Sequence, residues 1–218
     1  AALRERLIHG EPPRLEELWT FARLAGREAF AADVELLRAV AGSADARLRR
    51  WLVRLLGDAS DVPAEAVAVL SDLAEREADL QVRSQLASTA KRMPGDCGLP
   101  LAAAMLAADR SDDRADPHLP LLLWWAVEAH ADDASGMLED ALASMPELWA
   151  SQLFTGTVLE RLARRCGLVA DEQAFAICLT AVEIAPTEEL RRVIVRGFDE
   201  GLAAREPVEL PARLAESL

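Results

Sequence analysis

The chain has 218 residues, 51% hydrophobic and 28% charged, so it can bury a continuous core and wholesale disorder is excluded. Its 24 basic and 37 acidic residues give a net charge of −13. Such a surface repels phosphate backbones and anionic lipid, so neither nucleic acid nor a membrane surface is an expected partner. The longest apolar run, 119–127, is shorter than the ~20 residues of a membrane span, so direct membrane insertion is not expected.

The predicted elements are all helices. Apolar residues recur three and four positions apart along the whole chain, and strongly β-favouring residues never alternate with period two. Short breaks with helix-ending and helix-starting residues separate these segments. The predicted helices are 14–25, 30–41, 46–56, 63–77, 80–93, 98–109, 117–131, 134–144, 152–166, 171–184 and 188–204.

Residues typical of helix ends stand at the breaks. Side chains that can accept free N–H groups of a first turn occupy four predicted starts: Asp45, Asp79, Asp116 and Thr187. Proline, which lacks an N–H, is expected in the first turn at two positions: Pro63 and Pro117. Glycine at a helix end can take a positive φ, and four positions are predicted to do so: Gly26, Gly42, Gly57 and Gly167.

A repeat of about 35 residues runs through these helices. Aligning the fifth position of the clearest copies gives steps of 35, 34, 37, 35 and 36 residues. The aligned residues are Arg14, Arg49, Arg83, Pro120, Thr155 and Arg191. A period of this length with two helices per unit is typical of an α-solenoid, in which stacked units supply the buried core that no single unit has.

The string Asp45–Arg49 recurs as Asp79–Arg83, and this D-x-x-[VL]-R-x-x-[LA] form resembles the HEAT repeat. The resemblance implies that each arginine bonds an acidic turn residue of the next repeat, Arg49 to Asp79 and Arg83 to Asp116. Apolar residues at the fourth, eighth and twelfth positions are expected to form a buried stripe. We therefore predict an all-α fold, a single HEAT-like solenoid of five to six repeats over residues 1–218; an irregular helical bundle is the alternative.

The densest cluster of chemically distinctive side chains lies in segment 115–130. If these side chains face the inner surface of the solenoid, they form a recognition patch. The patch consists of Asp116, His118, Trp124, Trp125 and Glu128. The alternative interpretation is structural: two core tryptophans, a capping aspartate and a glutamate paired with a nearby arginine.

The preceding second helix adds three polar residues. Gln85, Thr89 and Arg92 fall on one face, away from the apolar stripe. Because adjacent repeats of a solenoid place their second helices side by side, these residues could flank the patch. A solvated helix face is the alternative interpretation.

No motif for catalysis or metal binding occurs. The three cysteines form neither CxxC nor CxxCH, and the three histidines show no ligand spacing with cysteine or carboxylate. No nucleophile elbow, phosphate-binding glycine loop or dinucleotide fingerprint is present. We expect no catalytic residues, no metal site and no cofactor in this segment.

Several strings carry a more specific resemblance. They are R-L-L-G-D at 54–58, V-R-x-Q-L-A-x-T-A-K-R-M-P at 82–94, D-P-H-L-P-L-L-L-W-W-A-V-E-A-H at 116–130, L-W at 148–149 and R-L-A-R-R at 161–165. Together they resemble the helical-repeat segment of the PVC-type haem-binding CxxCH proteins, also described as membrane-bound dehydrogenases. Cys97 and Met137 depart from that pattern.

The resemblance implies a position between two domains of a larger chain. In that family such a segment follows a β-propeller and precedes a c-type cytochrome domain, which holds the haem c; the parent is an exported, periplasmic enzyme. The chain starts without methionine, which fits a piece of a longer protein. These residues would then form a non-catalytic scaffold whose partners are the neighbouring domains.

Two other functions remain open. The repeat alone equally supports a free-standing module that binds a protein partner in the solenoid groove. A third hypothesis has Asp116, His118 and Glu128 assisting catalysis at a domain interface.

Overall fold

The structure is a computed structural model that describes residues 2–10, 14–59 and 61–217. It is all-α, as predicted: within these ranges sixteen α-helices and one π-helix form, and none of the residues lies in a strand. Contacts divide the chain into two compact units, residues 1–104 and 105–218.

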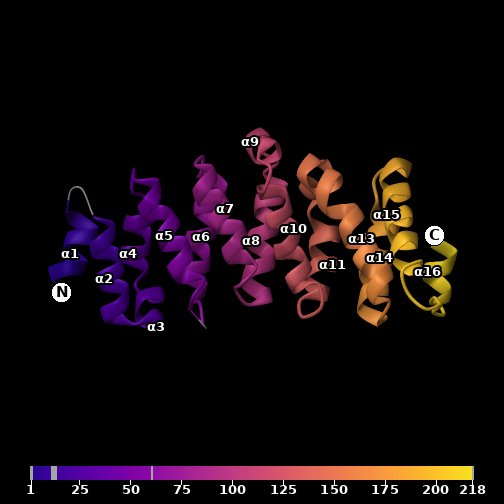
Figure 1. The fold of residues 1–218 in the computed structure, drawn as a ribbon, viewed down its shortest axis with the longest axis horizontal. Helices are drawn as coiled ribbons and strands as arrows, with labels where there is room; N and C mark the ends of the chain where they lie inside the picture. Colours follow the sequence, from indigo (N-terminus) through magenta and orange to yellow (C-terminus); the bar gives the residue numbers. More distant parts are fainter. Residues whose placement is uncertain (1, 11–13, 60, 218) are drawn as a thin grey trace. The chain divides into compact units, whose positions relative to one another are not determined.

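The N-terminal unit consists of short helices (Figure 1). Several of them pack against the helix that comes two or three helices later in the chain. α1 contacts α4, α2 contacts α5, α4 contacts α6 and α5 contacts α7. The helices are α1 (Ala2–His9), α2 (Leu15–Ala25), α3 (Arg27–Ala31), α4 (Val34–Ala41), α5 (Ala46–Leu56), α6 (Ala64–Arg76) and α7 (Leu80–Ala90). α8 (Gly95–Ala107) crosses the boundary between the units.

The buried stripe predicted from the repeat is confirmed in α5 and α7. The side chains at its fourth, eighth and twelfth positions have no solvent exposure. They are Leu48, Leu52 and Leu56 in α5 and Val82, Leu86 and Ala90 in α7. Each helix therefore presents one apolar face to its neighbours, and burial of that face provides the main stabilisation of the pair.

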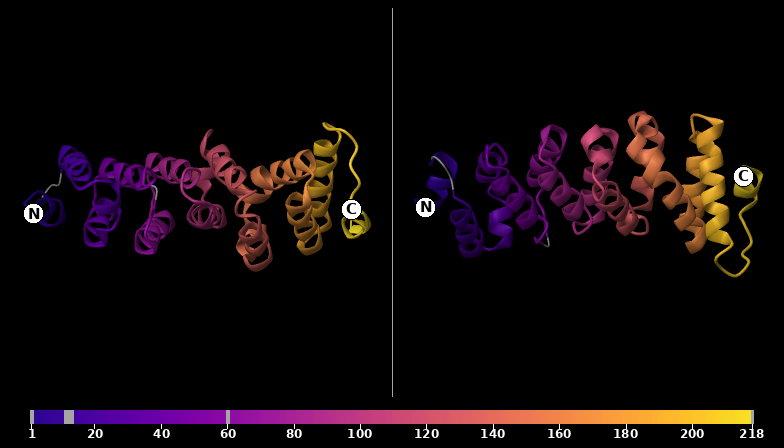
Figure 2. Two further views of the ribbon diagram at one scale, coloured as in Figure 1. Left: turned by 90° about the horizontal axis from the view of Figure 1, so that it is seen from below. Right: turned by 45° about the horizontal axis from the view of Figure 1, so that its top comes forward.

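The C-terminal unit contains the remaining helices and one π-helix. They are α9 (Ser111–Ala115), α10 (Leu119–His130), α11 (Ser135–Ser144), α12 (Pro146–Ala150), η1 (Phe154–Val158), α13 (Leu159–Val169), α14 (Glu172–Ile184), α15 (Glu188–Leu202) and α16 (Ala212–Ser217). Here α11 contacts α14, α13 contacts α15, and α14 also contacts α16. Figure 2 shows the extended segment 206–211, in yellow, that connects α15 to α16.

Three glycines allow an unusually close approach of α13 and α15. A Cβ atom on Gly167 would overlap the carbonyl oxygen of Phe198, and one on Gly201 would overlap the carbonyl oxygen of Arg164. A Cβ on Gly197 would lie 2.6 Å from the carbonyl oxygen of Glu160. The two helix backbones are therefore in direct contact, which only residues without a side chain permit.

Three of the four predicted N-caps are confirmed, whereas Asp116 lies two residues before His118, the N-cap of α10. Asp45 accepts a hydrogen bond from the N–H of Arg47, and Asp79 accepts from Gln81 and Val82. Thr187 accepts from Leu190, and Asp116 accepts from His118 and Leu119. Two further caps were missed, Asp33 before α4 and Asp171 before α14.

Several predicted helix ends are wrong in detail. Gly26 has the expected positive φ of 84°, but Gly42 and Gly57 keep right-handed values of −83° and −70°. Gly167 lies inside α13, which ends instead at Ala170 with φ 47°. For Gly167 the absence of a side chain serves packing against α15 and not the helix end.

Both prolines also lie outside their predicted first turns. Pro63 occupies the N-cap of α6, and Pro117 precedes α10 by two residues. Four short helices were not predicted: α1, α9, α12 and α16. Isolated one- or two-turn helices have little periodicity of their own, because they cannot form more than one repeat of an apolar stripe.

Over the described ranges, no helix is both long enough and apolar enough to cross a bilayer.

Candidate functional site

A pocket of about 350 Å³ opens on the N-terminal unit between α2, α3 and the end of α5. Its lining combines aromatic, aliphatic and charged side chains. They are Trp19, Ala22, Arg23, Arg27, Phe30, Leu55 and Asp58. None of these residues was predicted as a site residue, because they come from three segments that the sequence does not bring together.

The bend between α2 and α3 places two arginines at this pocket. Gly26 separates the helices with a φ of 84°, a value that residues with side chains rarely adopt. Arg23 precedes this bend, Arg27 follows it, and both line the pocket. The two arginines therefore line one pocket although they belong to different helices.

One wall of the pocket is an exposed tryptophan held by a second tryptophan. The ring of Trp19 is 40% exposed, and its centroid lies 4.8 Å from that of Trp51 in an edge-to-face arrangement. The guanidinium of Arg54 in turn lies 5.4 Å from the Trp51 ring centroid, within range of a cation–π interaction. Phe30, only 2% exposed, contributes a buried aromatic ring. Trp19 is thus a supported, accessible apolar surface.

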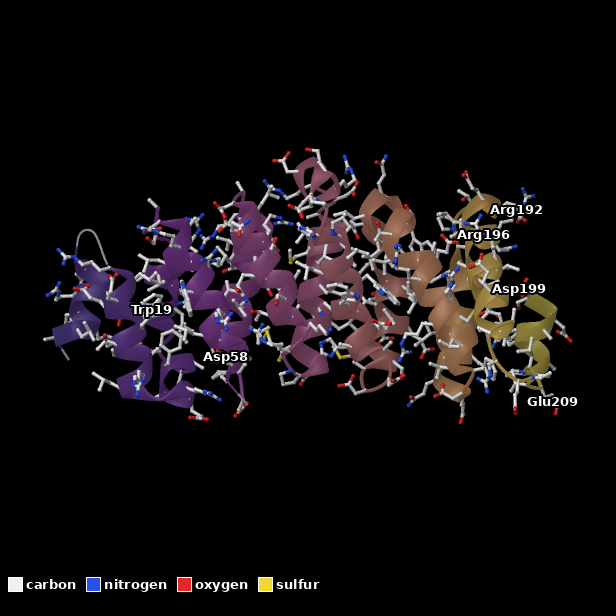
Figure 3. The ribbon with its side chains drawn as sticks, viewed as in Figure 1. Trp19, Asp58, Arg192, Arg196, Asp199 and Glu209 are labelled. Atoms are coloured by element: carbon white, nitrogen blue, oxygen red, sulfur yellow. The ribbon has the colours of Figure 1, made fainter. Side chains whose placement is uncertain are left out.

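The charged side chains of the pocket differ in their partners. Asp58 has an ion pair with Arg92, with 3.8 Å between Oδ1 and Nη2. Figure 3 labels Trp19 and Asp58, which both lie in the N-terminal unit. Arg23 and Arg27 are exposed, and among the described residues neither side chain makes a hydrogen bond or an ion pair. The pocket is therefore lined by two arginines that have no carboxylate partner within the described ranges.

The predicted residues Gln85, Thr89 and Arg92 do lie together, at the end of α7. The Oγ1 atom of Thr89 accepts from Nε2 of Gln85 and from Nη2 of Arg92, each at 3.2 Å. It also lies 3.2 Å from the carbonyl oxygen of Val53, to which it donates. Thr89 has no solvent exposure, so it joins α7 to α5, while Gln85 and Arg92 reach the surface.

Gly57 connects this polar face to the pocket. A Cβ on Gly57 would lie 2.6 Å from Cγ2 of Thr89 and 2.9 Å from Nη2 of Arg92. The residue after Gly57 is Asp58, which pairs with Arg92 and lines the pocket. One part of the predicted surface, Arg92, is therefore paired with a residue that lines a pocket the prediction did not include.

The other predicted residues lie on and before α10 in the C-terminal unit. Trp124 is buried, with 7% exposure, whereas Trp125 is 43% exposed. His118 and Glu128 are exposed as well. Asp116 accepts two backbone N–H groups at 2.8 Å each, and these bonds lower the pKa of its carboxyl group. Trp124 is thus a core tryptophan, as the structural interpretation of the sequence expected. Trp125 is exposed, as the interpretation as a surface patch expected.

The polar members of this set are spread along the helix. His118 and Glu128 are ten residues apart, which corresponds to about 15 Å along a helix axis. Asp116 is engaged by the first turn of α10. On α10 these groups therefore do not converge on one reacting atom, as general acid–base chemistry requires.

A second cavity, of about 540 Å³, borders the π-helix η1. Pro120, Thr155 and Leu190 all line it, and these residues come from α10, η1 and α15. The sequence predicted an ordinary helix here, because a π-helix differs only in its hydrogen-bond register and has no distinct residue pattern.

The cysteines do not fit attachment of a haem c group. Cys97, Cys166 and Cys178 are free and widely separated in sequence, and the latter two are buried. Burial raises the pKa of the Cys97 thiol to about 11 and that of Cys166 to about 12, so both are protonated at neutral pH. Over the described ranges, no group of three or more metal-ligating side chains gathers.

Comparison with known proteins adds no family assignment. No family model matches this chain, and no curated protein or solved structure shows a significant match to it.

Proposed function

We propose that the chain is a HEAT-like α-solenoid that acts as a non-catalytic scaffold for protein–protein interaction. The observation that carries this proposal is a set of hydrogen bonds between residues one sequence period apart. Thr89 bonds Val53, a separation of 36 residues, and Arg196 bonds Glu160, also a separation of 36. These separations match the period of about 35 read from the sequence, and stacking of like units would produce them.

The cavity at η1 supports the same repeat register. Pro120 and Thr155 occupy the aligned fifth position of successive repeats, and Leu190 is next to the third such position. All three border one cavity. Aligned or adjacent positions of three successive repeats therefore border one cavity, as stacking of like repeats would produce.

Small-angle scattering of the purified chain tests the solenoid. A compact globule of this length has a radius of gyration of about 17 Å. A row of stacked helix pairs is expected to give a clearly larger value, and a value near that of the globule would refute the proposal.

The surfaces that such a scaffold would offer include Gln85, Arg92 and the exposed side of α10 with Trp125 and Glu128. Exposed tryptophan and arginine side chains are common at the centres of protein interfaces. Thr89, which is uncharged and buried, would support Gln85 and Arg92 from below.

The resemblance to the PVC-type haem-binding CxxCH proteins suggests who the partners are. We propose that this scaffold docks a dehydrogenase-like propeller and a c-type cytochrome domain of the same parent chain. The haem would belong to the cytochrome domain, since the cysteines here do not fit it. The alternative is a free-standing module that binds a separate protein.

The gene and a binding experiment separate these possibilities. Coding sequence beyond both ends of this segment is expected to contain a propeller and a CxxCH motif. If it does, each neighbouring domain, purified separately, is expected to bind this chain in calorimetry, and Gln85→Ala with Arg92→Ala is expected to weaken that binding. Absence of both neighbours would remove the haem-protein context and leave the free-standing module.

A further inference from the structure

The pocket beside Trp19 has properties that the scaffold proposal does not require. Its volume of about 350 Å³ lies at the lower end of the range for ligand pockets, roughly 300–1,000 Å³. That space suits one or two side chains of a partner, whereas a large cofactor would need more. The pocket lies within one unit, so every group that forms it is placed by the same packed helices.

The apolar part of the pocket is prepared for an apolar side chain. Trp19 is held edge-to-face by Trp51, so its ring is already oriented before a partner arrives. Leu55 and the buried ring of Phe30 complete the apolar lining. An ordered aromatic surface loses little conformational entropy on binding, which favours affinity.

Two positively charged residues line the pocket, although the whole chain has a negative net charge. The net charge is −13, yet Arg23 and Arg27 both line this pocket. Some exposed arginines elsewhere are paired, as Arg47 is with Asp45 and Arg213 is with Glu183, whereas Arg38 has no carboxylate partner within the described ranges. Within the described ranges Arg23 and Arg27 have no such carboxylate, and a guanidinium group matches a carboxylate in a two-point geometry.

The one acidic side chain of the pocket is already compensated. Asp58 pairs with Arg92 at 3.8 Å, so its charge is partly balanced by the end of α7. A ligand carboxylate would be attracted to Arg23 and Arg27 on α2 and α3, and Asp58 follows α5. The arrangement therefore favours an anionic ligand over a cationic one.

We propose that this pocket binds an acidic segment of a partner protein that inserts one large apolar side chain. The apolar side chain packs against Trp19, and flanking carboxylates pair with Arg23 and Arg27. This inference rests on the proposed function, because it takes the ligand to be part of a protein. It goes further by naming the pocket and the chemistry of the partner segment.

The test is calorimetry of the purified 218-residue chain with a blocked pentapeptide of sequence EEFEE. Saturable one-to-one binding is expected. Arg23→Gln together with Arg27→Gln should weaken it about tenfold or more, because two charge-assisted pairs are lost. Trp19→Ala should weaken it as well. Arg38→Gln removes an exposed charge from the same unit outside the pocket and should leave affinity unchanged.

Control peptides separate the other occupants. Replacing the phenylalanine of the peptide with alanine, or its glutamates with glutamines, should each reduce affinity. Equal binding of the neutral peptide, stronger binding of the basic peptide KKFKK, or no binding of EEFEE would each overturn the proposal. Sedimentation also tests whether the chain forms a dimer and whether the double arginine variant abolishes that dimer. Such a result would overturn the proposal too, since a second copy of the chain would then occupy the pocket.

The outcomes remain distinct from those of the scaffold proposal. A globule-like radius of gyration with intact, arginine-dependent peptide binding would refute the solenoid and keep the pocket. A solenoid-like radius and neighbour-domain binding without peptide binding would refute only the pocket proposal.

Discussion

Arg49 and Glu77 form a two-point ion pair that joins the start of α5 to the turn between α6 and α7. Nε of Arg49 donates to Oε2 of Glu77 at 2.6 Å, and Nη2 donates to Oε1 at 2.8 Å. Glu77 is only 3% exposed and also accepts the N–H groups of Ala78 and Asp79. Arg49 donates in addition to the carbonyl oxygen of Ser43. One carboxylate therefore ties the turn before α7 to α5.

Removal of this carboxylate is expected to be costly. Glu77→Ala should lower the free energy of unfolding by about 3 kcal/mol, because it leaves a largely buried guanidinium unpaired. Urea unfolding followed by circular dichroism measures the change. Arg47→Ala, which removes a highly exposed partner of Asp45, is the control and should leave the free energy of unfolding nearly unchanged. Equal effects of the two variants would contradict the structural role of Glu77.

The same pair predicts a loss of stability in acid. Burial by itself raises the pKa of Glu77, but the hydrogen bonds from Arg49 and from the backbone N–H of Asp79 outweigh it and hold the pKa below its ordinary value of 4.5. As the pH falls, the unfolded chain takes up the proton before the folded chain does. The contribution of Glu77 to the free energy of unfolding is therefore complete above about pH 4.5, and it is lost as the pH falls through the lower pKa of the folded chain.

Unfolding free energies measured from pH 6 down to pH 3 check this expectation. The wild-type chain should lose stability more steeply below pH 4.5 than Glu77→Gln, which has no proton to gain. The Arg4 side chain also lowers the pKa of Asp33. Since Asp33 is present in both chains, its contribution to the acid dependence is the same in both and cancels in the comparison. Parallel curves for the two chains would show that Glu77 is not responsible.

The sequence predicted the local features of this structure and missed the pairing details. The apolar stripe, including Leu52 and Leu86, and the caps at Asp45 and Asp79 depend on residues within one helix turn, so spacing alone reveals them. The partner of Arg49 was expected at Asp79 and is Glu77, two residues earlier. The choice between two nearby carboxylates depends on the exact path of the turn.

The candidate site was predicted only in part for the same reason. Gln85, Thr89 and Arg92 lie three and four residues apart on one helix, and the structure brings them together. The pocket beside Trp19 combines α2, α3 and the end of α5, which no periodic pattern connects. The positive φ of Gly26 was predicted, but its consequence for Arg23 and Arg27 follows only from the packed helices.

The two adjacent tryptophans of α10 are expected to respond differently to truncation. Trp124→Ala should lower the free energy of unfolding by about 3–5 kcal/mol, because its ring is 93% buried and removal leaves a cavity. Trp125→Ala should cost clearly less, since its ring is 43% exposed. Thermal unfolding of both variants tests the assignment. A larger loss for Trp125 would place that ring, and not Trp124, in the core.

Direct contact between α13 and α15 gives the last prediction. Gly201→Ala would push a methyl group into the backbone of α13, at the carbonyl oxygen of Arg164 and 2.7 Å from the nitrogen of Leu168. Backbone atoms cannot move aside as a flexible side chain can, so the helices must separate. A loss of about 3 kcal/mol in unfolding free energy is expected, at the upper end of the usual cost of overpacking.

Gly136→Ala is the matched control for that substitution. It makes the same chemical change in α11, where a Cβ would meet no atom within 4 Å. It should therefore stabilise the chain slightly, by about 0.4–1 kcal/mol, because alanine restricts the unfolded chain more than glycine does. Urea unfolding of both variants measures these changes in the free energy of unfolding. If Gly201→Ala is as well tolerated as Gly136→Ala, then α13 and α15 do not pack backbone to backbone.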